Sequence, residues 1–128
     1  MKPPTAAFLE KSRALLEQAK KALDVGLDEV AGRTAYLAGF HAAQALIFER
    51  DDRVLKTHKG VQGEFGRLVR DDSLFDIALR ALLGRSYQLK TIADYETSPD
   101  AEVTHAQAAE AIATAQRFVD AIEKAIAQ

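Results

Sequence analysis

An apolar run in the first half of the chain constrains the fold more than any other feature: residues 33–48 read RTAYLAGFHAAQALIF. At about 100° per residue, one helical stripe contains Tyr36, Phe40, Ala43 and Ile47. A second stripe of smaller residues lies beside it and contains Ala35, Ala38, Ala42 and Leu46. A helix that is apolar around most of its circumference has to be covered on several sides. The run therefore predicts the central helix of an all-α bundle.

The remaining arc of this helix is polar. It carries Arg33, Thr34, His41 and Gln44, with Leu37 among them. A lone histidine in such an arc is more often a hydrogen-bonded structural residue than a catalytic one, and both interpretations of His41 stay open. Because Phe40 is a large residue in the most surrounded helix, we expect Phe40→Ala to cost about 3–5 kcal/mol of unfolding free energy. Thr34→Ala should cost far less.

Length and composition indicate one domain, residues 1–128, since 128 residues that are 48% hydrophobic can bury one sizeable core. With 17 basic and 19 acidic residues the net charge is -2, so the chain lacks the positive field of a general nucleic-acid binder, and no DNA specificity is expected. A local basic cleft is still allowed. The chain has no cysteine, and its start, MKPPTAAFLEKS, lacks the apolar run of a signal peptide. We therefore expect a cytoplasmic protein without a membrane span.

Four more helices are predicted around the central one, which gives a four- to five-helix up-and-down antiparallel bundle. The first begins at Pro3 and Pro4 and ends at Gly26. Asp28 is a cap candidate for the central helix, which should end in the charged turn 49–53. A short helix follows residues 57–60 and has an apolar face formed by Val61, Phe65, Leu68 and Val69.

The second half of the chain predicts two long helices. Residues 71–73, Asp-Asp-Ser, are cap candidates for the fourth helix, and a loop is expected near Ser98 and Pro99. Thr104 and Gln107 match a capping box at the start of the last helix. Arg85 projects into the apolar arc of the fourth helix, so its guanidinium should meet a carboxylate, lie at an interface, or extend to solvent along its aliphatic stem.

The fourth helix also carries a stripe away from its expected core face, formed by Leu83, Tyr87, Lys90 and Asp94, with Tyr95 beside it. The plain interpretation is a solvated face with a Lys90–Asp94 pair. The alternative is a site that concentrates a cation, a carboxylate and two phenols. We also expect Leu83 and Tyr87 to form an exposed patch that is buried in a homodimer.

Residues 57–60, Thr-His-Lys-Gly, precede a helix whose first amides could hold an anion with help from Lys59. Capping by Thr57 is the simpler explanation, because nearly every helix start has a cap. The three histidines, His41, His58 and His105, lie on separate segments without an HExxH spacing. No Walker A loop, GxGxxG element or GxSxG elbow is present. The sequence therefore predicts neither a metal site nor a cofactor.

Three motifs resemble those of the small stand-alone HEPN-domain proteins of bacteria and archaea. They are RTAYLAGFHAA at 33–43, THKG at 57–60 and ADY at 93–95, and their order and spacing match over nearly the whole chain. The resemblance implies a four- or five-helix bundle that usually dimerises, with polar residues of the second and fourth long helices approaching a cleft. Many members of the family are encoded beside a minimal nucleotidyltransferase, with which they form a toxin–antitoxin type pair.

Other HEPN proteins are metal-independent ribonucleases that carry an arginine, four to six intervening residues and a histidine on the fourth helix. On this motif Lys90 takes the arginine position and Tyr95 the histidine position, with Asp94 before it. Lysine neutralises a phosphate without bidentate geometry. Tyrosine, with a reference pKa of about 10, and aspartate, at about 3.9, are poor bases at neutral pH. The departure argues against the usual ribonuclease chemistry.

Three functions follow from these observations. The first is a binding or regulatory protein that partners a nucleotidyltransferase and contacts a nucleotide or RNA through Arg33, His41, Lys59, Lys90 and Asp94. The second is a ribonuclease toxin in which His41 or His58 replaces the missing histidine. The third is a structural oligomeric module. For the first two we expect His41, Lys90 and Asp94 to face one groove close to Arg33, with the pKa of His41 displaced from its usual value.

Overall fold

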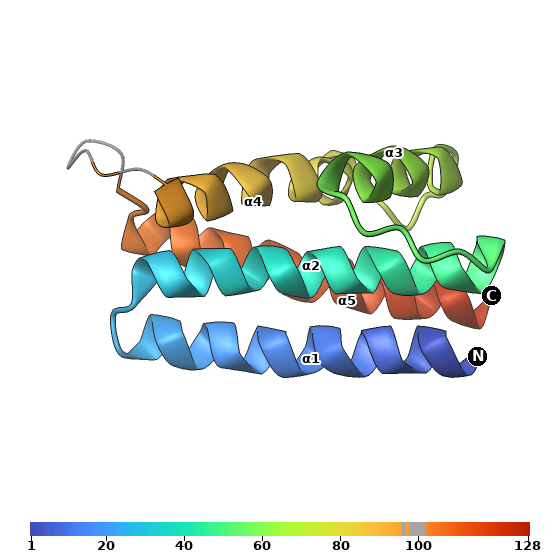
Figure 1. Ribbon diagram of the computed structural model, residues 1–128, viewed down its shortest axis with the longest axis horizontal. Coiled ribbons are helices and arrows are strands. Elements are labelled where there is room, and N and C mark those ends of the chain that lie inside the picture. Colours follow the sequence, from blue (N-terminus) through green and yellow to red (C-terminus); the bar gives the residue numbers. More distant parts are fainter. Residues whose placement is uncertain (96, 98–101) are drawn as a thin grey trace.

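The computed structural model describes residues 1–95, 97 and 102–128, and this part of the chain folds into five α-helices without a strand (Figure 1). The helices are α1 (Pro3–Asp24), α2 (Asp28–Asp51), α3 (His58–Leu68), α4 (Ile77–Tyr95) and α5 (His105–Ala127). α2 packs against each of the other four, so the prediction of a central helix in an all-α bundle is confirmed. None of these helices has a segment apolar and long enough to span a membrane. The predicted loop around Ser98 and Pro99 lies outside the described residues.

The connection between α1 and α2 is a tight turn at Gly26, close to where the sequence predicts the end of the first helix. Gly26 adopts a φ of 79°, which favours a residue without a Cβ, and Leu27 N donates to Ala22 O at 2.9 Å. Asp28 is the first residue of α2 and does not cap it; its Oδ1 lies 2.7 Å from His105 Nδ1 instead. The acidic side chain still suits the positive end of the helix dipole.

Two predicted helix caps are confirmed, and the predicted start of the fourth helix is wrong. Thr57 Oγ1 accepts from Gly60 N at 3.0 Å, and Thr104 and Gln107 form the reciprocal capping box of α5. The fourth helix does not begin at residues 71–73. It begins at Ile77, where Asp76 Oδ1 accepts from Leu79 N at 3.0 Å, because the segment before it turns inward to bury Phe75.

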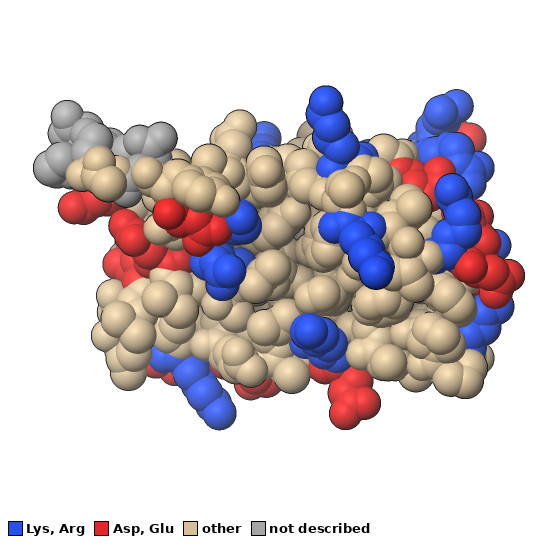
Figure 2. All heavy atoms as spheres, in the orientation of Figure 1, with Lys and Arg blue, Asp and Glu red and all other residues tan. Residues whose placement is uncertain are grey.

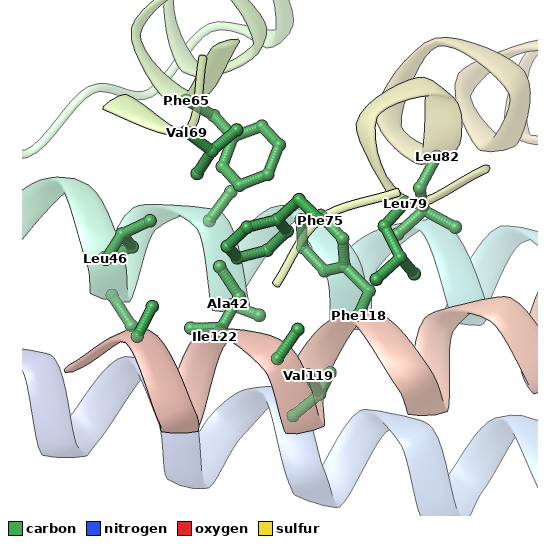
Figure 3. Close-up of a cluster of buried hydrophobic side chains, with 14 of the residues drawn as sticks. Ala42, Leu46, Phe65, Val69, Phe75, Leu79, Leu82, Phe118, Val119 and Ile122 are labelled. Carbon is green, nitrogen blue, oxygen red and sulfur yellow. The ribbon is translucent and has the colours of Figure 1, made fainter. Parts of the chain in front are cut away.

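Three phenylalanines from different segments form the centre of the core (Figure 3). Phe65 of α3, Phe75 before α4 and Phe118 of α5 are each at most 2% exposed, with ring centroids 5.0–6.2 Å apart. Phe40 is only partly buried and packs at the margin of this cluster. The prediction that it is a deeply buried site is therefore wrong, whereas Thr34, placed on the polar arc, is 8% exposed.

α4 lies closer to α2 than its sequence pattern indicates. A Cβ on Gly39 would stand 3.0 Å from Leu82 Cδ2, so the two helices approach at a residue that has no side chain. Leu83 is 2% exposed at this contact, while Tyr87 is 38% exposed. The predicted exposed patch of Leu83 and Tyr87 is therefore wrong for Leu83, because the stripe assigned to solvent faces α2. Arg85 is exposed, on another side of α4.

Candidate functional site

The close contact of α2 with α4 brings charged residues from both helices together at one end of the bundle. Arg33 Nε donates to Asp94 Oδ1 at 2.9 Å, and Lys90 Nζ donates to Asp94 Oδ2 at 2.8 Å. Lys90 Nζ also lies 5.5 Å from the ring centroid of Tyr95, a cation–π contact on a tyrosine that is 73% exposed. The structure therefore joins four residues that the sequence nominated, from positions 61 residues apart.

These contacts fix the charge state of the cluster. The hydrogen bond from Lys90, followed by the charges of Lys90 and Arg33, holds the pKa of Asp94 below its usual value. The same hydrogen bond raises the pKa of Lys90. Asp94 is thus ionised at neutral pH and is a weak proton acceptor. Two cations around one carboxylate leave the cluster with a net positive charge.

Beside this cluster lies a group of aromatic residues from three helices. The His58 and Tyr87 rings are stacked, with centroids 3.9 Å apart and planes 15° apart. Tyr36 completes the group: its hydroxyl lies 2.9 Å from His58 Nδ1 and its ring 5.5 Å from that of Tyr87. Since Tyr36 is three residues from Arg33 and Tyr87 three from Lys90, the two groups are continuous on both helices. We call these six residues the α2–α4 seam: Arg33, Tyr36, His58, Tyr87, Lys90 and Asp94.

Burial sets the protonation of the aromatic group. It raises the pKa of Tyr36 to about 12, with a smaller contribution from Tyr87, so the phenol keeps its proton and can donate it. Burial also lowers the pKa of His58, and a hydrogen bond that the imidazole donates to Gln62 opposes this shift. His58 is therefore neutral at pH 7. We assign Nδ1 as the acceptor from Tyr36, which places the ring proton on Nε2.

His41 is not part of the seam. Its Nδ1 lies 2.7 Å from Gln44 Oε1, its ring packs between Phe8 and Phe40, and Gln44 Nε2 donates in turn to Leu55 O. Burial lowers the pKa of His41, so that value is displaced as expected. Eight residues of α2, about 12 Å of helix, separate it from Arg33. The predicted convergence with Lys90 and Asp94 is thus wrong, and its contacts are those of a structural histidine.

Two further features complete the description of the site. Lys59 is exposed on the first turn of α3, next to His58. Tyr36 was assigned to a core stripe, and it is 4% exposed, but its hydroxyl reaches the seam. The signal for this was its type, because a buried tyrosine hydroxyl needs a partner that phenylalanine would not. Across residues 1–95, 97 and 102–128, no cluster of three or more His, Cys, Asp or Glu could hold a metal ion.

The surface around the α2–α4 contact is sparsely charged. Figure 2 shows this face as mostly uncharged, with single Lys and Arg side chains across it and acidic side chains near the two ends of the bundle and along its lower edge. Such a face presents uncharged area, to which the partly exposed ring of Tyr87 contributes, together with isolated cations. This combination suits a ligand that has both flat apolar groups and negative charge.

The comparisons with known proteins agree with the fold and the motifs. A relative from Methanocaldococcus jannaschii, named "Putative toxin MJ0605", is 32% identical over 120 residues, which is 94% of this chain and 87% of that protein. The crystal structure of TT1696 from Thermus thermophilus superposes with a TM-score of 0.77 over 94% of this chain and 96% of that one; at 21% identity it shows the fold alone. The model of the HEPN domain matches residues 5–125, and the chain therefore belongs to the HEPN family.

Proposed function

We propose that this chain is a toxin-type HEPN protein that binds RNA through the α2–α4 seam. The observation that carries the proposal is the continuity of the His58–Tyr87 stack with the Arg33–Asp94–Lys90 cluster, built from three separate helices. Aromatic faces stack on bases without requiring a sequence, and nearby cations neutralise the phosphates between them. The M. jannaschii relative, by its name, supports a toxin role.

Asp94 competes with the RNA in this proposal. Its carboxylate pairs with Arg33 and Lys90 until a phosphate of the RNA takes its place. Binding should therefore be measured with a fluorescent single-stranded RNA at low salt, by anisotropy. Lys90→Ala should weaken binding, whereas Asp94→Asn should strengthen it by releasing the two cations from their carboxylate. Lys21→Ala, at an exposed position on α1, is the matched control for a lost charge. Equal losses for Lys90→Ala and Lys21→Ala would refute binding at the seam.

The stacking step can be tested separately. Tyr87→Ala removes an exposed ring and should weaken RNA binding by about tenfold, in line with about 1–3 kcal/mol per stacked base. Tyr87→Phe keeps the ring and should bind almost as the wild type does. If Tyr87→Phe and Tyr87→Ala lose affinity equally, the phenol and not the stack makes the contact.

A ribonuclease function is the second candidate, and the position of His58 favours it. His58 lies against Tyr87, which is one turn from Lys90, and is neutral at pH 7. A ribose 2'-hydroxyl that replaces the Tyr36 hydroxyl as the donor to His58 Nδ1 could pass its proton to that nitrogen, while Lys90 stabilises charge on the phosphate. His58→Ala should lower cleavage by about 10²-fold or more in the presence of EDTA, and His41→Gln should leave it intact. Binding without cleavage by the wild type would leave the first proposal alone.

We also propose a minimal nucleotidyltransferase as partner and a homodimer as the assembled state. Both rest on family membership and on the toxin relative. Copurification from the native host should recover the nucleotidyltransferase, and expression without it should arrest growth. Light scattering should report a dimer, and a monomer at micromolar concentration would contradict that part of the proposal.

A further inference from the structure

A cavity of about 330 Å³ lies between α4 and α5, on a different side of α4 from the seam. At 100° per residue, Arg85 stands about 140° around the helix from Lys90. Four of the residues that line the cavity are apolar: Ala78, Leu82, Leu89 and Ala111. Six are polar or charged: Arg85, Ser86, Gln88, Gln107, Glu110 and Thr114. The volume is that of a small-molecule pocket, and the proposed RNA-binding function makes no use of it.

Arg85 of α4 and Glu110 of α5 bring opposite charges to this cavity without pairing. Neither residue forms an ion pair with any residue in the described part of the chain. A carboxylate partner was one of three predicted surroundings for Arg85, beside an interface and solvent, and no carboxylate among residues 1–95, 97 and 102–128 pairs with it. Two opposite charges that line one cavity but remain apart leave room for a ligand that carries the complementary charge at each end.

The rest of the lining restricts the chemistry of such a ligand. Leu82 is 3% exposed and Ala111 is 8% exposed, so these buried apolar residues form a floor of the cavity. Gln107 Oε1 accepts from Thr104 N in the capping box, and Arg85 and Glu110 are the two charged residues of the lining. An arginine fork matches a carboxylate in bidentate geometry, and a carboxylate accepts from an ammonium group.

We propose that the α4–α5 cavity binds a small zwitterion with an apolar side chain, of the free amino-acid type. Its carboxylate pairs with Arg85, its ammonium group pairs with Glu110, and its side chain lies over the apolar floor. The same charges occur at the two ends of a short apolar peptide, and the experiment separates the two sources. The proposal is independent of RNA binding, because no residue of the seam lines the cavity.

The test is an NMR titration of the full, ¹⁵N-labelled chain with L-leucine. We expect saturable shifts confined to residues of α4 and α5 around the cavity. Two analogues each remove one charge: 4-methylpentanoate lacks the amine and 3-methylbutan-1-amine lacks the carboxylate. Each should bind at least tenfold more weakly than leucine. Equal binding by either analogue would overturn the zwitterion, and tighter binding of dileucine than of leucine would assign the site to peptides.

Variants provide the second arm. Arg85→Gln and Glu110→Gln should each weaken leucine binding tenfold or more, while Arg70→Gln and Glu29→Gln, at exposed positions outside the cavity, should not. Absence of chemical-shift changes in the wild type at 20 mM leucine would refute the proposal. This measurement does not depend on whether any variant folds. Unchanged affinity in Arg85→Gln would refute it as well, because the carboxylate would then have another partner.

Discussion

Two aromatic clusters in this molecule differ in what they contain and in what covers them. The core cluster of Phe65, Phe75 and Phe118 has no polar atom and is at most 2% exposed. The seam cluster of Tyr36, His58 and Tyr87 has a polar atom on every ring, and Tyr87 is 38% exposed. Phenylalanine would serve packing alone at least as well, because it brings no polar group that must find a partner. The difference agrees with our proposal, in which the core cluster serves stability and the seam cluster binds RNA.

The largest expected effect tests the core side of this comparison. Phe118→Ala empties a fully buried site touched by two other rings, so it should lower the free energy of unfolding by about 3–5 kcal/mol. Phe40→Ala is the matched control and should cost clearly less, because Phe40 is only partly buried at the edge of the cluster. Chemical denaturation measures both. A larger loss for Phe40→Ala would mean that the stability centre lies on α2.

A smaller effect is expected inside the seam. Tyr36→Phe removes the hydroxyl that lies 2.9 Å from His58 Nδ1 and should cost about 1–2 kcal/mol, mainly by leaving a half-buried ring nitrogen unpaired. The pKa of His58, followed by NMR, should change in the same variant. Tyr87→Phe leaves that contact in place and should be close to neutral in stability. A neutral Tyr36→Phe would show that the hydroxyl contact contributes nothing to the fold.

The smallest effect concerns pH. Burial lowers the pKa of both His41 and His58, so the unfolded chain binds more protons than the folded one just below pH 6.5. Stability should therefore be full above about pH 6.5 and should fall as the pH drops from there through the lowered folded-state pKa values. Thermal melts from pH 7.5 to 5 measure this slope. His58→Gln and His41→Gln should each reduce it, and a slope unchanged in both would contradict the assigned burial effects.

The sequence predicted where the helices lie in the chain better than which side of each helix faces its neighbours. Caps and turns follow from local chemistry, so the Thr57 cap, the capping box at Thr104 and the turn at Gly26 were all foreseen. Which side of α2 faces which neighbour does not follow from periodicity, because the helix is apolar almost all round. Phe40 and His41 were misplaced for that reason.

The start of α4 was missed for a different reason: Asp-Asp-Ser is good cap chemistry, but burial of Phe75 decides where the chain turns. The charged part of the site was nevertheless predicted in composition. Arg33, Lys90 and Asp94 were nominated from their spacing and are in contact. The role of Tyr36 was not foreseen, since its contact with His58 depends on the tertiary packing of α3 against α2.

The spacing of α2 and α4 depends on an atom that Gly39 lacks. A methyl group there would stand 3.0 Å from Leu82 Cδ2, so either this buried side chain or α4 itself would have to shift by a few tenths of an ångström. Gly39→Ala should thus act as a wedge that moves α4 outward without altering any residue of the seam. Gly39→Ala and Gly39→Ser would give two variants that keep the side chains of the seam and differ in the distance between α2 and α4. Such a set would separate the size of an RNA that fits from the strength with which it is held.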